Sequence, residues 1–196
     1  MQPTWQDHYD LNFWLWACLH DAEAFLEASR KSTAAMHEVS KDAVHNFGKN
    51  RAHLNAERLT AQALLHLSKY HFVLTTGSLV KTLTRVAPLF PAVQPMYDAA
   101  EHLKKEGLYL RNMLEHADIN MAAAKKGTPR GGFVRKSNLL PELPGSSGGT
   151  ADATSLLIDQ NGHWLGGRLN VERVMAEVRP IHEAARAIPP PTSLRP

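Results

Sequence analysis

The clearest helical pattern of the chain is the stretch LKKEGLYLRNMLEHADINM, residues 103–121. Its apolar and small residues recur every three or four positions, as a helix buried along one seam requires. They are Leu103, Gly107, Leu110, Leu114, Ala117 and Met121. The pattern extends in both directions and predicts a long helix over residues 94–126. It sets the fold class, because two further long helical patterns precede it.

The first of these patterns lies near the N-terminus. It predicts a helix from about Tyr9 to Arg30, on the spacing of Leu11, Leu15, Leu19, Ala22 and Leu26. Residues 31–49 are less periodic, and Gly48 weakens any continuous helix there. A second pattern predicts a helix over residues 50–86, in which Gly77 is expected to introduce a bend. Its predicted core stripe is Leu59, Ala63, Leu67, Tyr70 and Leu74, thickened by Leu64, Phe72, Leu79 and Leu83.

The C-terminal third changes character. Glycines, prolines and serines predict a flexible loop over residues 127–154. A β-hairpin is expected over residues 155–168, with a type I′ turn at Asn161-Gly162. Asn170 is the predicted N-cap of a last helix over residues 171–187, and a proline-rich tail, 189–196, follows. The predicted fold is mainly α, an up-and-down helical bundle of four to five helices in one domain, 1–188, with a small β-hairpin inserted before the last helix.

Bulk composition limits the functional classes. A hydrophobic content of 43% is that of a globular protein, and a net charge of +3 excludes a strong overall field for nucleic acid. The single cysteine, Cys18, cannot form an intrachain disulfide, which favours a cytoplasmic location. The N-terminus has no basic signal-peptide region, and the apolar run 11–19 is too short to span a bilayer, so no membrane association is expected.

The most unusual residues of the 94–126 helix are Arg111-Asn112-Met113-Leu114-Glu115-His116. At roughly 100° per residue, Arg111, Asn112 and His116 fall on an arc turned away from the Leu110 stripe. Asn112 and His116 are neighbours at i, i+4. Leu108 and Tyr109 share the arc, which predicts that a second surface, such as a second subunit, covers it.

These residues resemble the motif of the HEPN superfamily, in which Arg, a polar residue and His lie on a late helix of an up-and-down bundle. Arg111, Asn112 and His116 match it, with four residues between Arg and His. The resemblance implies a homodimer in which two motif helices form one site. It also implies a metal-independent endoribonuclease of HEPN type, a toxin or defence component, with a nucleotidyltransferase-like antitoxin as partner. The hairpin and the glycine-rich loop lie outside the resemblance.

The implied chemistry is attack of a ribose 2′-OH on the adjacent phosphate. His116 would move the proton, Arg111 would stabilise the charge on phosphorus, and Asn112 would orient His116 or the substrate. No cofactor or metal is expected, and DNA would be spared because it lacks the 2′-OH. A carboxylate, Glu115, lies one turn from Arg111 and would reduce its positive charge.

A basic cluster follows the motif helix. Its members are Lys125, Lys126, Arg130, Arg135 and Lys136, interpreted either as contacts to an RNA backbone or as a solvated loop. The eleven histidines include no His-Glu-x-x-His spacing, so a metal site is not expected. Two alternatives to the ribonuclease remain. One is a non-catalytic HEPN-like dimeric interaction or nucleotide-binding module, and the other is an unrelated helical bundle.

Overall fold

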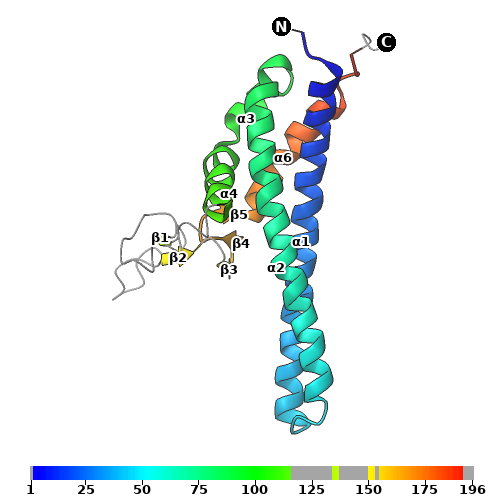
Figure 1. Cartoon of the computed structure of the whole chain (residues 1–196), viewed down its shortest axis with the longest axis vertical. Helices are drawn as coiled ribbons and strands as arrows, with labels where there is room; N and C mark the ends of the chain where they lie inside the picture. The colour runs from blue at the N-terminus through cyan, green and yellow to red at the C-terminus, as the bar shows by residue number, and fades with distance from the viewer. Residues whose placement is uncertain (1, 116–133, 137–149, 153–154, 192–196) are drawn as a thin grey trace. The chain divides into compact units, whose positions relative to one another are not determined.

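The computed structural model of the chain describes residues 2–115, 134–136, 150–152 and 155–191, without the side chains of Glu115 and of the segments 134–136 and 150–152. In this part the protein is mainly helical, with a small antiparallel sheet before the last helix, as the sequence predicts (Figure 1). The chain divides into two compact units. Residues 1–19 and 73–196 form the core unit, and residues 20–72 form the helical-pair unit.

Two long helices contribute to both units. Helix α1 spans Trp5–His45 and helix α2 spans Arg51–Val86. The prediction that the first helix ends near Arg30 is wrong, because α1 continues for four further turns. The predicted weak point at Gly48 is confirmed, since Phe47 and Gly48 have φ of 52° and 74° in the turn between the helices. These left-handed angles end α1 and reverse the chain.

The helical-pair unit has a thin core. Its two helices lie side by side in Figure 1, and the Phe25 and Phe72 rings stack with centroids 6.4 Å apart. The other buried positions are mostly small: Ala22, Ala28, Ser29 and Ser32. The predicted core stripe of the second helix is wrong in this unit, because Leu59, Leu64, Leu67 and Tyr70 are exposed. Two helices bury only one face of each, so the other apolar face remains open.

The core unit has a conventional apolar interior, built from the start of α1, the end of α2 and the last helix. The predicted core positions Leu11, Leu15, Leu79 and Leu83 are fully buried. They pack in one interior with Leu103, Leu110, Val174, Val178 and Ile181, which are also fully buried. Hydrophobic burial of this size is the main stabilising contribution to the unit.

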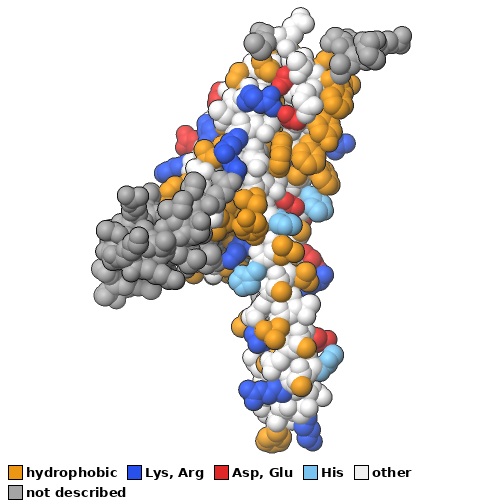
Figure 2. Space-filling model, in the orientation of Figure 1, with side chains coloured by type: hydrophobic (Ala, Val, Ile, Leu, Met, Phe, Trp, Pro, Cys, Tyr) orange, Lys and Arg blue, Asp and Glu red, His pale blue; other side chains and the backbone are white. Residues whose placement is uncertain are grey.

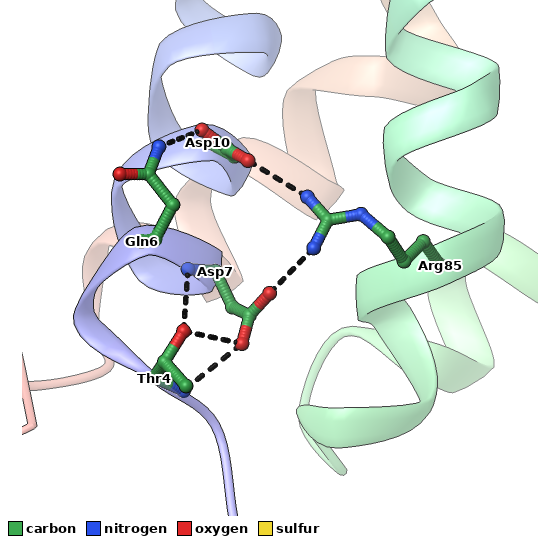
Figure 3. A network of polar contacts seen from close by, with 5 residues as sticks. All are labelled: Thr4, Gln6, Asp7, Asp10 and Arg85. Carbon is green, nitrogen blue, oxygen red and sulfur yellow. Dashed lines mark hydrogen bonds and ion pairs between the residues drawn. The ribbon is translucent and has the colours of Figure 1, made fainter.

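A polar network at the start of α1 ties this helix to α2 (Figure 3). Thr4 and Asp7 form a capping box, in which the Asp7 N–H donates to Thr4 Oγ1 and the Thr4 N–H donates to Asp7 Oδ2. Arg85 of α2 then pairs with Asp7 at 2.6 Å and with Asp10 at 2.7 Å. Hydrogen bonds from Thr4, and after them the Arg85 charge, lower the pKa of the Asp7 carboxyl.

The predicted helix over residues 94–126 is interrupted. A 3₁₀ turn, η1 (Ala87–Leu89), leads to a short α3 (Gln94–Ala99), and Ala100 leaves helical geometry with ψ of 64°. The helix resumes at Glu101, passes through a π-helical segment, η2 (Leu103–Gly107), and continues as α4 (Leu108–Glu115). Glu177 of the last helix accepts hydrogen bonds from the N–H groups of His102 and Leu103. The Glu177 carboxylate, which is distant in sequence, thus caps the N-terminal end of the resumed helix. The interruption at Ala100 therefore depends on a tertiary contact.

The β structure forms two antiparallel sheets. Strands β1 (Val134–Lys136) and β2 (Thr150–Asp152) pair within the segment predicted as a flexible loop. The predicted hairpin is present as β3 (Leu156–Asp159) and β4 (Gly162–Leu165), and β5 (Leu169–Asn170) adds a third strand that was not predicted.

The predicted type I′ turn of this hairpin is wrong. Asp159 pairs with Gly162, so the turn residues are 160 and 161. Among residues 159–162, only Gly162 has a positive φ, of 115°. The glycine is needed here for a second reason, because a Cβ at this position would strike the Glu172 carboxylate.

The last helix, α6, spans Val171–Arg186. The predicted N-cap is confirmed, because Asn170 Oδ1 accepts from the Arg173 N–H at 2.7 Å. None of the described helices combines the length and the apolar content that crossing a membrane requires.

Candidate functional site

The motif helix α4 places its polar residues in different environments. Arg111 is half-buried, Asn112 is exposed and Met113 is buried. His116 lies outside the described residues, and so does the side chain of Glu115. The structure therefore locates two of the three predicted catalytic residues, Arg111 and Asn112, and does not describe their distance to His116.

Arg111 packs against a glycine of α2. A Cβ built on Gly77 would lie 2.6 Å from Arg111 Cβ and even closer to Cδ. One helical turn before Arg111, at the end of η2, a Cβ on Gly107 would lie 2.8 Å from Thr76 Cγ2. Both glycines thus permit a close approach of the two helices. Helix α2 continues through Gly77, so this residue makes room for Arg111 and does not terminate the helix.

This packing corrects the prediction of an outward arc around Arg111. The half-buried Arg111 lies on α2, and Tyr109 lies beneath the Arg168 guanidinium, whose carbon is 4.6 Å from the ring centroid. The second surface expected over this arc is therefore supplied in part by the same chain. Among the motif residues whose side chains are described, 111–114, Asn112 is the exposed one.

A buried ion pair lies directly before the motif and was missed by sequence reasoning. Glu106, only 2% exposed, receives two hydrogen bonds from Arg168, from Nε at 2.7 Å and from NH2 at 3.1 Å. The hydrogen bonds to Glu106 raise the pKa of Arg168. A signal was present, because Glu106 precedes Leu110 by four residues and shares its buried face. A carboxylate on that face required a buried cationic partner.

His102 forms a second buried polar contact near the motif. Its Nε2 accepts the Asn170 N–H at 2.9 Å, so this nitrogen carries no proton. The Trp164 ring lies edge-on to the imidazole, with centroids 6.4 Å apart. Burial, and after it the charge of Arg173, lowers the pKa of His102. The neutral imidazole thereby joins η2 to the start of α6.

We expect the stability of the protein to fall as the pH drops below about 6.5, the ordinary pKa of histidine. The pKa of His102 is lowered in the folded state, so the unfolded chain binds the proton more readily. The stabilisation that the neutral His102 provides is complete above about pH 6.5. As the pH falls from there to the folded-state pKa of His102, the free energy of unfolding decreases by up to about 1.4 kcal/mol per pH unit.

Urea unfolding at pH 7.5 and pH 5.5 measures this loss. His102→Gln keeps an acceptor for the Asn170 N–H and cannot titrate, so its loss should be smaller than that of the wild type. Equal losses would remove His102 as the cause. The pKa of His182 is also lowered, by burial foremost. Because both proteins contain His182, its contribution to the pH dependence of stability cancels in the comparison.

The remaining predicted site residues are not located by the structure. Lys125, Lys126 and Arg130 lie outside the described residues, and for Arg135 and Lys136 only the backbone, in β1, is described. Within the described ranges, no group of three or more His, Cys, Asp or Glu side chains is arranged to hold a metal ion.

Comparisons with family models, curated proteins and solved structures found no match to this chain. Membership of the HEPN superfamily stays a hypothesis that rests on the residue pattern Arg111-Asn112-x3-His116.

Proposed function

We propose that this chain is a metal-independent endoribonuclease whose site is built around Arg111, Asn112 and His116. The observation that supports the proposal is the close packing of Arg111 against Gly77. Gly77 and Gly107 let α4 approach α2 closely, which holds the Arg111 stem while its neighbour Asn112 stays exposed. The π-helical segment η2 directly precedes these residues, and π-helical turns occur frequently at functional sites.

The proposed reaction needs a general base, a general acid and a cation that stabilises the developing negative charge. His116 takes the proton of the ribose 2′-OH, whose oxygen attacks the adjacent phosphorus. Arg111 stabilises the negative charge that develops on the phosphoryl oxygens. The bond to the 5′-oxygen then breaks and that oxygen takes up a proton, which leaves a 2′,3′-cyclic phosphate and a 5′-OH. Lys125, Lys126, Arg130 and Arg135 would contact the RNA backbone.

The proposal extends to the setting implied by the resemblance. The protein would act in the cytoplasm as a toxin or defence component, and a nucleotidyltransferase-like antitoxin would neutralise it. Two copies would bring their motif helices together, so that Arg111 and His116 from both chains complete one anionic site.

We expect Arg111→Ala and His116→Ala each to reduce RNA cleavage by at least about 100-fold, the scale of losing one charge-stabilising or proton-transfer group. Cleavage of a labelled RNA in EDTA, with a matched DNA strand and analysis of the 3′ ends, measures this. Arg30→Ala and His66→Ala, at exposed positions of the helical-pair unit, are the matched controls. Equal cleavage by all variants, or cleavage of the DNA strand, would contradict the proposal.

A second candidate is a non-catalytic dimeric module in which the same residues fix an interface or hold a ligand phosphate. The half-buried Arg111 favours it, because an arginine whose stem packs on Gly77 also supports the fold. In that case the wild type cleaves no RNA, and Asn112→Glu weakens dimerisation in sedimentation measurements.

A further inference from the structure

The helical-pair unit carries a long groove between α1 and α2, with a volume of about 820 Å³. Figure 2 shows hydrophobic and histidine side chains across the visible face of these two helices, which occupy the lower end of the view in Figure 1. The apolar lining consists of Ala24, Ala28, Ala35, Ala56, Ala61, Leu64 and Leu67. Leu64 and Leu67 are 52% and 53% exposed. Leucines exposed to this degree in an apolar groove indicate a surface that a partner covers.

The spacing of the lining residues indicates that the partner is helical. On α2 they include 53, 57, 60, 64, 67 and 71, with alternating steps of four and three, and residues 56, 61 and 68 lie beside this row. On α1 they include 20, 24, 27 and 31, with the same alternation. This is the heptad pattern with which helices pack along a shared left-handed seam. Each helix of the pair therefore has a second seam besides the one that joins it to its neighbour.

The thin core of the unit gives a physical reason for a further helical layer. Its buried side chains are two phenylalanines, alanines and serines, together with the polar Asp42 and Lys69, and they bury little apolar area. An antiparallel helix pair becomes a well-packed bundle when two more helices close its open face. A second copy of the same pair supplies both helices at once.

The charges along the groove fit such a copy turned end to end. Asp21 and His71 line one end, and His53 and Glu57 line the other. A half-turn about the middle of the groove brings the end that holds His53 and Glu57 in one copy against the end that holds Asp21 and His71 in the other. Each end therefore offers a carboxylate to an imidazole of the other copy, and a carboxylate accepts a hydrogen bond from a neutral imidazole and attracts a charged one.

The middle of the groove has no net charge that would oppose the second copy. Lys31 pairs with Glu27 on its own helix at 3.3 Å. Leu64 lies two residues from the midpoint of the α2 lining, about 3 Å along the helix. In the reversed arrangement the two Leu64 side chains therefore approach each other near the axis.

We propose that this groove is where a second copy of the chain docks its own α1–α2 pair, related by a two-fold axis, to form an antiparallel four-helix bundle. The surface is separate from the α4 motif, and the proposal requires no RNA cleavage. The interface is isologous, so this surface by itself joins two copies and no more.

Sedimentation equilibrium of the full chain tests the bundle. The wild type should have at least twice the chain mass of 21.7 kDa. Leu64→Glu should raise the dimer dissociation constant by at least about tenfold, because it places a carboxylate in the apolar centre. Leu59→Glu is the matched control, since Leu59 lies on the same helix, is 57% exposed and does not line the groove. It should remain dimeric, with the helical circular dichroism of both variants unchanged.

A cysteine at the axis localises the contact independently of affinity. Leu64→Cys should be joined to a second copy by a short thiol-reactive cross-linker, whereas Leu59→Cys and the wild type, whose Cys18 is buried, should not. A monomeric wild type, equal dimerisation of both glutamate variants, or no Leu64→Cys cross-link would overturn the proposal. A dimer broken by Asn112→Glu and unaffected by Leu64→Glu would assign association to the α4 surface and overturn this proposal alone.

Discussion

Replacing Arg168 with methionine is expected to destabilise the protein by about 3–5 kcal/mol, the cost of removing one partner of a buried ion pair. Arg168 makes two hydrogen bonds to the buried Glu106 carboxylate, and the methionine leaves that carboxylate without its cationic partner. Urea unfolding at pH 7 measures the loss.

Two further variants separate the ion pair from the general effect of losing an arginine. Arg30→Met removes an exposed arginine, paired with Glu27 at 2.7 Å, and should cost only a few tenths of a kcal/mol. Glu106→Leu combined with Arg168→Met replaces both partners with apolar side chains and should be more stable than Arg168→Met alone. A double variant as unstable as the single one would show that packing, not the unpaired charge, causes the loss.

Gly77→Ala is expected to destabilise the protein by about 2 kcal/mol, although alanine alone would favour the helix by about 1 kcal/mol. The new methyl group would meet Arg111 Cβ at 2.6 Å. This atom is fixed to the α4 backbone, so the side chain cannot avoid the contact by changing its rotamer, and the helices have to separate. Thermal and urea unfolding of the variant measure the cost.

A double-mutant cycle identifies the obstacle. In an Arg111→Gly background, Gly77→Ala should be neutral or stabilising by up to about 1 kcal/mol, since the obstructing Cβ is gone. If Gly77→Ala lowers the free energy of unfolding by the same amount in both backgrounds, the new methyl group does not clash with Arg111. The packing of Arg111 against Gly77 described above is then wrong.

The parts of the fold that could be predicted depend on local sequence signals. The Asn170 cap, the Gly48 turn and the start of the last helix depend on residues within a few positions of each other, and all three are confirmed. The interruption at Ala100 could not be found in this way. It depends on Glu177, which lies about 75 residues later and caps the restarted helix.

The candidate site was predicted less well, for the same physical reason. A helical wheel places Arg111 away from Leu110, but it contains no information about the glycine on another helix that receives the side chain. The stripe of Leu59, Leu67 and Tyr70 was assigned to the core by periodicity alone. Periodicity identifies an apolar face without saying whether the same chain or another molecule covers it.

The π-helical segment η2 has a consequence for insertions and deletions. A π turn holds one residue more than the corresponding α turn, so deleting a single residue from Leu103–Gly107 offers the chain a regular α-helix. A π turn and the α turn that replaces it cover nearly the same rotation, so Arg111 and Asn112 would keep their present neighbours. A deletion inside α4 before Arg111 would instead turn Arg111 by roughly 100° away from Gly77, because no wider turn absorbs the lost residue.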